Sequence, residues 1–384
     1  MKIDITINGR RHAFDLAEQL NKHDCLSRLI TSYPTFKVKE WNIEKAHIKS
    51  LLPLEVFKRY VVQKTPFAKE KLHVLQKNLF DSWASKCLTA SSDIFVGWSG
   101  NSLQSLRRAK SMDKITIIVR GSSHMLYQQQ LLQEEYALAD IKYIPAPRAI
   151  VEQELQEYRE ADYISIPSSF VRRSFVEYGI SESKLIQVPY GVDLSHFKQI
   201  KKQDNVFRVI FAGGFSLQKG SHYLLQAICE LDLPDFEFWH LGNVSKEIEP
   251  FIKKYSSDKI ILKGPKPQNE LYKYYSQGSV FVMPSIQEGL AMVQPQAMAC
   301  GLPLICTTNT GGEDLIDEGK EGFVVPIRDV AALKEKILYL YENPEICREM
   351  GQAAKEKVSE GFTWNEYGQK MIEEYKKILN AQKN

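Results

Sequence analysis

The sequence predicts an α/β protein of two domains, each built on a doubly wound parallel sheet. Three observations support this. Short runs of apolar and β-branched residues recur along the chain, each followed by a stretch of helical character. The length of 384 residues suits two ordinary domains. A polar stretch without strand periodicity, residues 193–205, separates six such runs from six others.

The runs define the expected strands. In the first half they lie at 2–7, 28–33, 93–98, 114–119, 162–167 and 185–190. In the second half they lie at 207–214, 236–242, 259–264, 279–285, 302–308 and 322–327. Runs of this length with helices between them are typical of buried parallel strands. Ligands of such sheets bind beyond the carboxyl ends of the strands, so we expect a site in the cleft between the two domains.

The polar stretch places the first domain at residues 1–198 and the second at 199–363. An amphipathic helix is expected in the tail, from about Trp364 to residue 384. Its apolar face repeats at helical spacing. The residues of this face are Tyr367, Met371, Ile372, Tyr375 and Ile378.

The composition excludes several classes of protein. Hydrophobic residues make up 43% and charged residues 25% of the chain, which indicates a globular protein. No run is long and apolar enough to cross a membrane, and the N-terminus lacks the apolar core of a signal peptide. The six cysteines form no CxxC pair, which argues against structural zinc. We therefore expect a cytoplasmic protein with reduced thiols.

One segment, residues 37–86, is strongly basic although the whole chain carries a net charge of only +3. It holds 11 Lys and Arg against 5 Asp and Glu, interleaved with Trp, Phe, Leu and Val. Such a segment is suited to docking on the anionic inner face of a membrane. It is also compatible with a solvated helical face over an ordinary apolar stripe. No nucleic-acid-binding module is recognisable.

The stretch EGLAMVQPQAMACGLPLI, residues 288–305, carries the clearest chemistry. Pro295 is tolerated in a first helical turn, so a helix is expected to begin near 291–293. Its unpaired N–H groups, with those of Gly289 and Leu290, would form an anion site. Glu288 and Gln296 would lie about 12 Å apart on one face, and both side chains pair with hydroxyl groups. The alternative is a strand–loop–helix unit with incidental polar residues.

A second motif, FAGGFSLQKG at 211–220, follows an expected strand. Its glycines, Gly213 among them, allow a ligand to approach the backbone, and Lys219 offers a charge for a phosphate. Alone, this motif fits an ordinary exposed lysine near a helix start better than it fits a ligand site. The chain has neither GxGxxG after its first strand nor GxxxxGK[ST]. This counts against a nicotinamide-dependent oxidoreductase and a P-loop NTPase.

Together these segments resemble the family 4 glycosyltransferases, which are retaining enzymes of the GT-B fold. The similarity rests on 161–197, 211–220, 263–285, 284–305 and 307–326. It covers roughly 160–375 well and the first 150 residues thinly, through 8–20 and 119–124. The resemblance implies two Rossmann-like domains facing across a cleft, with the first binding the acceptor and the second the nucleotide-sugar donor. It also implies that the last helix crosses back onto the first domain.

The resemblance assigns roles to particular positions. Glu288 would lie near the donor sugar and Gln296 at the ribose, while Lys219 would neutralise the diphosphate. His124 would lie near the transferred sugar, although a lone histidine is often structural. The implied catalytic residues are therefore His124 and Glu288. The implied donor-binding residues are Gly9, Arg10, Gly213, Lys219, Gly264, Lys266, Gly289, Leu290, Ala291, Met292 and Gln296.

Two positions depart from the family pattern. The family has Arg five residues before the lysine, where this chain has Gly214, and Glu where this chain has Gln296. Loss of the arginine removes a phosphate partner worth ~2 kcal/mol. Arg10, Arg11 or Arg120 are candidates to replace it from the facing domain.

The implied reaction moves a hexose from a UDP- or GDP-sugar to a hydroxyl of a glycan or lipid-linked acceptor, as in the synthesis of envelope polysaccharide or glycolipid. No cofactor is expected, and the absence of a DxD pair predicts metal independence. Two alternatives stay open. One is a GT-B nucleotide-sugar epimerase or hydrolase. The other is a non-catalytic nucleotide-sugar-binding subunit, which the two departures favour.

Overall fold

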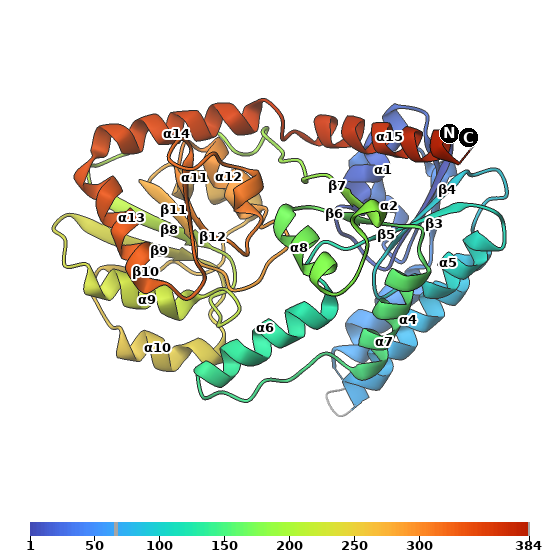
Figure 1. Ribbon diagram of the computed structural model, residues 1–384, viewed down its shortest axis with the longest axis horizontal. Helices are drawn as coiled ribbons and strands as arrows, with labels where there is room; N and C mark the ends of the chain where they lie inside the picture. Colours follow the sequence, from blue (N-terminus) through green and yellow to red (C-terminus); the bar gives the residue numbers. More distant parts are fainter. Residues whose placement is uncertain (65–67, 383–384) are drawn as a thin grey trace.

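Two parallel sheets, each covered by helices, form two lobes that lie side by side (Figure 1). The computed structural model describes residues 1–64 and 68–382. The basic segment 37–86 and the expected tail helix therefore each include a few residues, 65–67 and 383–384, outside the described part of the chain.

The first sheet has seven strands in the order β3-β2-β1-β4-β5-β6-β7, all parallel. The strands are β1 (Ile3–Ile7), β2 (Leu26–Thr31), β3 (Ile48–Ser50), β4 (Ile94–Trp98), β5 (Ile115–Val119), β6 (Tyr163–Ile166) and β7 (Leu185–Gln187). The helices between them are α1 (Ala13–Lys22), α2 (Thr35–Val38), α3 (Leu52–Phe57), α4 (Lys69–Lys86), α5 (Leu103–Lys110), α6 (Met125–Leu138), α7 (Arg148–Glu160) and α8 (Ser169–Glu177). A π-helix, η3 (Lys58–Val62), follows α3 directly.

The second sheet has six parallel strands in the order β10-β9-β8-β11-β12-β13. They are β8 (Phe207–Ala212), β9 (Phe236–Leu241), β10 (Ile260–Leu262), β11 (Val280–Met283), β12 (Leu304–Thr307) and β13 (Gly322–Val325). The helices are α9 (Ser221–Glu230), α10 (Glu249–Lys254), α11 (Leu271–Tyr275), α12 (Val293–Ala299), α13 (Val330–Glu342), α14 (Pro344–Ser359) and α15 (Trp364–Ala381). Every strand expected from the sequence is present, and the predicted fold class is confirmed.

The strands are buried on both faces, which explains their continuous apolar runs. All five residues of β1, β4 and β5 are buried. Along β4, Ile94 and Val96 pack with the cluster that contains α1 and α15, while Phe95 packs with the cluster under α4 and α5. The alternation of side chains along the strand thus supplies two separate apolar layers.

The sequence did not predict β3. Of its three residues only Ile48 is buried, and β3 pairs with one neighbour, β2, at the edge of the sheet. A strand of this length with one apolar inward side chain leaves no recognisable run.

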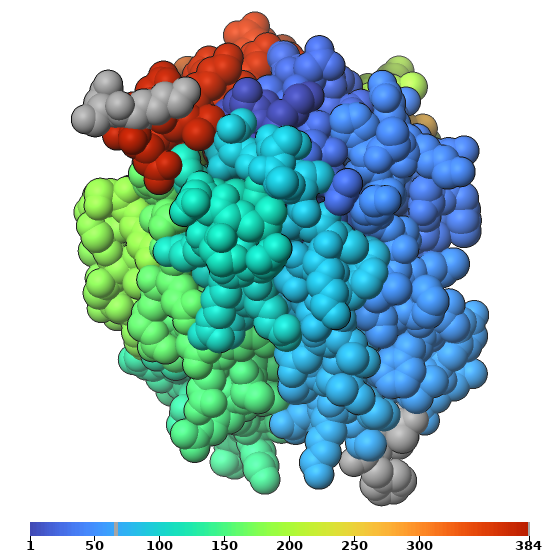
Figure 2. All heavy atoms as spheres, turned by 90° about the vertical axis from the view of Figure 1, so that its right-hand side faces the viewer, coloured from blue at the N-terminus to red at the C-terminus, as the bar shows by residue number. Residues whose placement is uncertain are grey.

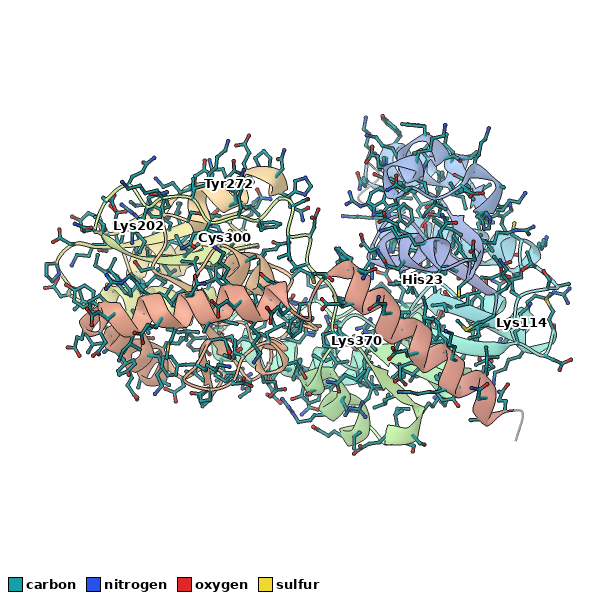
Figure 3. All side chains as sticks on the ribbon, turned by 90° about the horizontal axis from the view of Figure 1, so that it is seen from above. His23, Lys114, Lys202, Tyr272, Cys300 and Lys370 are labelled. Atoms are coloured by element: carbon teal, nitrogen blue, oxygen red, sulfur yellow. The ribbon has the colours of Figure 1, made fainter. Side chains whose placement is uncertain are left out.

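The last helix, α15, confirms the expected crossing and packs on α1 of the first lobe. Figure 3 shows α14 and α15 from above as consecutive helices, one over each lobe, with Lys370 labelled on the second. A capping box starts α15: Thr363 Oγ1 accepts from the N–H of Glu366, whose carboxylate accepts from the N–H of Thr363. The five predicted apolar residues of this helix are all buried.

The two connections between the lobes lie side by side. Residues 193–206 form no helix or strand, and just before them Val192 pairs with Thr363 in an isolated parallel bridge. The N–H of Val192 donates to the carbonyl of Phe362 over 2.6 Å. The division into domains at 198/199 stays a prediction.

A third contact between the lobes lies far from this crossing, where α6 reaches the second lobe (Figure 1). Glu135 of α6 is fully buried there and pairs with two basic side chains of the second lobe. They are His222, at 2.8 Å, and Arg328, at 2.7 Å.

No helix in the described part of the chain is long and apolar enough to cross a membrane.

Candidate active site between the two sheets

The site lies where loops from the carboxyl ends of the two sheets meet. The loop after β5 carries the sequence RGSSH, residues 120–124, and the loop after β11 carries QEG, residues 287–289. Ser122 and Gly289 form an isolated antiparallel bridge between these loops. The carboxyl edge of each sheet therefore faces the other, as expected for a ligand site in doubly wound folds.

Lys219 and Glu288 form an ion pair at this edge. Lys219 ends the loop between β8 and α9, and Glu288 lies between β11 and α12, so two neighbouring strands bring the two side chains together. Both are largely shielded, with side-chain exposures of 23% and 14%. An ammonium held beside a carboxylate in this setting can exchange that partner for an incoming anion, because both partners keep access to solvent.

A cavity of about 930 Å³ lies between the lobes and receives Gln296. Gln296 and Met292 line it from the second lobe, and Arg10, Arg11 and Trp41 line it from the first. Gln296 is 6% exposed, and no hydrogen bond of its side chain to other described residues is present. The structure thus brings three predicted donor-binding residues, Arg10, Met292 and Gln296, to one cavity.

Helix α12 begins at Val293, within the range expected from Pro295. The backbone before it is partly engaged: the N–H of Ala291 donates to Thr310, and the carbonyl of Gly289 accepts from Ser168 Oγ over 2.7 Å. The expected anion site therefore lacks the N–H of Ala291. Leu290 is buried in the core at 6% exposure.

Glycines follow three neighbouring strands, β8, β9 and β10, at the carboxyl edge of the second sheet. Gly213 and Gly264 have left-handed backbone, with φ of +134° and +68°, and both have open space where a Cβ would lie. Gly242, which the sequence analysis missed, joins them: its N–H donates to Gly264, and a Cβ on it would lie 1.9 Å from the carbonyl oxygen of Gly213. A ligand can therefore approach the backbone closely at Gly213 and Gly264.

Two other predicted residues lie apart from the ion pair. Gly9, at the end of β1, has φ of +99° and accepts a hydrogen bond from Thr31 Oγ1. Lys266 places its ammonium over the ring of Tyr274, 5.2 Å from the ring centre. No contact joins either residue to Lys219 or Glu288 among the described residues.

His124 caps α6, and its Nδ1 accepts from the N–H of Leu126. Its ring is 3% exposed and stacks on Tyr178 at 4.7 Å, with Tyr158 and Phe175 also in contact. Burial, together with the charge of Arg120, lowers the pKa of His124 to about 4. The imidazole is therefore neutral at physiological pH and packs in an aromatic cluster. A contact with the second lobe is made by Ser122, in the loop that precedes His124.

The candidates for the missing phosphate partner at Gly214 differ in availability. Arg120 is buried and occupied: it pairs with Glu154 at 2.7 Å and donates to Gln128 and to the carbonyl of Ser123. Arg10 stacks on Trp41 at 4.5 Å, and it lines the cavity together with Arg11. Of the three arginines, Arg10 and Arg11 present their charge to the cavity.

The described residues contain no group of three or more His, Cys, Asp or Glu placed to hold a metal ion.

Known proteins that resemble this chain include glycosyltransferases. Residues 193–357 match the family model of the glycosyl transferases group 1. The uncharacterized glycosyltransferase MJ1178 of Methanocaldococcus jannaschii is 35% identical over 155 residues, which cover 40% of this chain and 44% of the relative. WcaL of Salmonella typhimurium, whose name assigns it provisionally to colanic acid biosynthesis, is 24% identical over 221 residues, 54% of each chain. The chain thus spans about half the length of these curated relatives.

Two solved structures share the whole fold. Sucrose-phosphate synthase from Thermosynechococcus elongatus has a TM-score of 0.72 at 18% identity, covering 99% of this chain and 100% of that one. Anabaena HepE, solved with UDP and glucose, has a TM-score of 0.68 at 14% identity, covering 98% of this chain and 100% of that one. The chain therefore has the GT-B fold, and its residues 193–357 match the glycosyl transferases group 1, in agreement with the glycosyltransferase resemblance of the sequence. Family 4 and a retaining reaction stay predictions.

Proposed function

We propose that the protein is a retaining glycosyltransferase that moves a hexose from a UDP- or GDP-sugar to a hydroxyl of a glycan or lipid-linked acceptor. The observation that carries this proposal is the Lys219–Glu288 ion pair at the meeting edges of the two sheets. Gln296, on the helix that follows Glu288, lines the cavity between the lobes. The names of relatives support the class of product: WcaL is named for an envelope polysaccharide. The UDP and glucose of the HepE structure support the class of donor.

In the proposed reaction the bond between the anomeric carbon and the diphosphate oxygen breaks. The acceptor oxygen forms its bond to the same carbon on the same face, and its proton passes to the departing diphosphate. The ammonium group of Lys219 would leave its ion pair with Glu288 and pair with the diphosphate instead. There it would stabilise the negative charge that develops on the leaving group. Glu288 would contact the sugar, and Gln296 would hold the ribose hydroxyls. No metal takes part in this scheme, because Lys219 and backbone N–H groups bear the charge.

Four variants test these roles: Lys219→Ala, Glu288→Gln, Gln296→Ala and Gln296→Glu. Lys219→Ala should weaken binding of the nucleoside diphosphate and also lower kcat. Glu288→Gln should retain that binding while kcat falls about 10²-fold, as for a contact made in the transition state. Gln296→Ala should mainly raise KM by the ~1 kcal/mol of an ordinary hydrogen bond, and Gln296→Glu should remain active.

The measurements are kcat and KM for a panel of UDP- and GDP-sugars, and the Kd of each nucleoside diphosphate from thermal shifts. If Glu288→Gln lost nucleotide binding while Gln296→Ala lost only turnover, the donor would lie along this segment in the opposite orientation, with its ribose at Glu288 and its sugar at Gln296. Activity removed by EDTA and restored by Mg²⁺ would refute metal independence. Nucleotide-sugar binding without transfer or hydrolysis would point to a non-catalytic subunit, and turnover without an acceptor to an epimerase or hydrolase.

We further propose that the protein docks on the anionic inner face of a membrane through the basic segment 37–86. Within the described part of this segment, apolar side chains protrude from α3, η3 and α4 among the lysines. They are Val56, Tyr60, Leu75 and Leu79. In Figure 2, which faces the first lobe, the light-blue residues of this segment fill the lower right of the surface. Exposed apolar side chains on a lysine-rich segment suit the interface of an anionic bilayer, and a lipid-linked acceptor would be presented there.

A further inference from the structure

One glutamine joins the two lobes at the proposed site. Gln287 is fully buried, and its Nε2 lies 2.7 Å from Ser122 Oγ and 2.9 Å from Ser123 Oγ of the first lobe. The same nitrogen lies 2.8 Å from the backbone carbonyl of Glu288. A carbonyl only accepts, so Nε2 is the end of the amide that faces these oxygens, and its two hydrogens serve the three of them.

The other end of the amide holds the loop that carries Lys219. Gln287 Oε1 accepts from Gln218 Nε2 over 3.1 Å, and Gln218 also donates to the backbone carbonyl of Gln287. The N–H of Ile286 in turn donates to the carbonyl of Gln218. One side chain therefore contacts the RGSSH loop, the backbone of Glu288 and the residue before Lys219.

We propose that Gln287 is a positioning residue, which rests on the proposed function: its amide aligns Glu288 and Lys219 for reaction only when the RGSSH loop of the first lobe is docked on it. The hydroxyls of Ser122 and Ser123 complete the hydrogen bonds of a buried amide. Separation of the lobes leaves that amide short of partners, because nothing else among the described residues replaces the two serines. Docking of the lobes and alignment of the site are thereby coupled.

The packing beside Gln287 supports the same docking. A Cβ on Gly289 would lie 1.9 Å from the carbonyl oxygen of Gly121 and 3.0 Å from the Cα of Ser122. The two loops thus meet backbone to backbone, and glycine is required at 289 by the space available. This contact is independent of the amide and fixes the same relative position of the loops.

The test compares Gln287→Met with a matched control, Gln294→Met. Both glutamines are fully buried, but Gln294 donates to the carbonyl of Thr310 within the second lobe and makes no hydrogen bond to a described residue of the first. We measure kcat and KM for the donor, the Kd of the nucleoside diphosphate, and Tm. Gln287→Met should lower kcat about 10²-fold, the effect of a misplacement near 1 Å, with the Kd within about twofold of wild type. Gln294→Met should show a similar loss of Tm and keep kcat within a fewfold.

A second variant on the other lobe covers the case in which Gln287→Met fails to fold. The double change Ser122→Ala and Ser123→Ala removes the hydroxyls alone and should reproduce the fall in kcat. Adding it to Gln287→Met should cause little further loss, since the same contact is already gone. Equal losses of kcat in the two glutamine variants, or additive losses in the combined variant, would overturn the positioning role. Wild-type protein that neither binds nor turns over a nucleotide-sugar would instead refute the proposed function.

Discussion

His124, which the family resemblance places near the transferred sugar, is held in its neutral form by its surroundings. Its aromatic surroundings and Arg120 hold its folded pKa near 4, against an ordinary value near 6.5. Between these values the unfolded chain binds a proton that the folded chain excludes. Stability contributed by this residue is therefore complete above pH 6.5 and is lost as the pH falls toward 4.

We predict that His124→Phe removes this part of the pH dependence. In urea unfolding between pH 4.5 and 7, wild-type protein should lose up to about 3 kcal/mol more than the variant as the pH falls, the amount that corresponds to the shift. The difference between the two proteins isolates His124 from other titrating groups. Parallel curves for the two proteins would show that the ring is not held neutral.

Gly214 allows the missing arginine to be restored. Its φ is outside the left-handed region, and no atom of the described residues lies within 4 Å of the position a Cβ would take, so a side chain fits there. We predict that Gly214→Arg lowers the Kd of a nucleoside diphosphate about tenfold, the effect of a charge-assisted hydrogen bond of roughly 1.4 kcal/mol. Affinity for the uncharged nucleoside should not change, and Gly214→Ala is the matched control. An equal gain with the nucleoside would mean that the added arginine does not act on the phosphates.

Among the elements, the sequence predicted those strands and helices whose burial leaves a recognisable apolar pattern along the chain. Runs such as ITIIV of β5 are apolar because both faces of the sheet are covered, and the apolar stripe of α15 reports its contact with α1. The sequence did not predict β3, because this edge strand of three residues buries only one side chain. Periodicity records the surroundings of an element and carries little information about a strand this short.

The site was less accessible to prediction, because its contacts join residues distant in sequence. Lys219 and Glu288 were assigned to different parts of the donor, yet they form one ion pair. Arg120 was a candidate phosphate partner, but Glu154, which pairs with it, lies on α7. The role of Gln287 depends on which hydroxyls of the other lobe it meets. Only the fold reveals such pairings, since the spacing of two residues within one motif does not report distances between lobes.

The contact of α15 with α1 can be tested at Gly368. A Cβ there would lie 2.4 Å from the Cβ of Gln19, which is fixed by the α1 backbone. We predict that Gly368→Ala destabilises the protein, because overpacking costs ~1–3 kcal/mol and exceeds the helix-propensity gain of ~1 kcal/mol. Gln369→Ala, at the next and exposed position, should stay within ~0.5 kcal/mol of wild type in the same thermal unfolding experiment. A stabilised Gly368→Ala would show that the two helices are not in close contact.

For the whole molecule, the basic surface predicts salt-dependent binding to lipid. Liposomes with anionic lipid should sediment the protein at low salt and release it at high salt, because salt screens the attraction between lysines and lipid head groups. Reversing the charge of two exposed lysines, Lys69→Glu with Lys71→Glu, should weaken sedimentation. The matched control reverses Lys253 and Lys254, which are exposed on α10 of the other lobe. Equal sedimentation with neutral liposomes would exclude an electrostatic attachment.

The crossing of α15 also has a consequence for the order in which the chain is made. Gln19 on α1 meets Gly368, which leaves the ribosome 349 residues later (368 minus 19). The apolar face of α1 therefore stays uncovered while the second lobe is synthesised, because α15, the helix that packs on it, is made afterwards. The first lobe is therefore completed only after the second has been made, so the nascent chain exposes an uncovered apolar surface throughout synthesis of the second lobe, when chaperones recognise such surfaces.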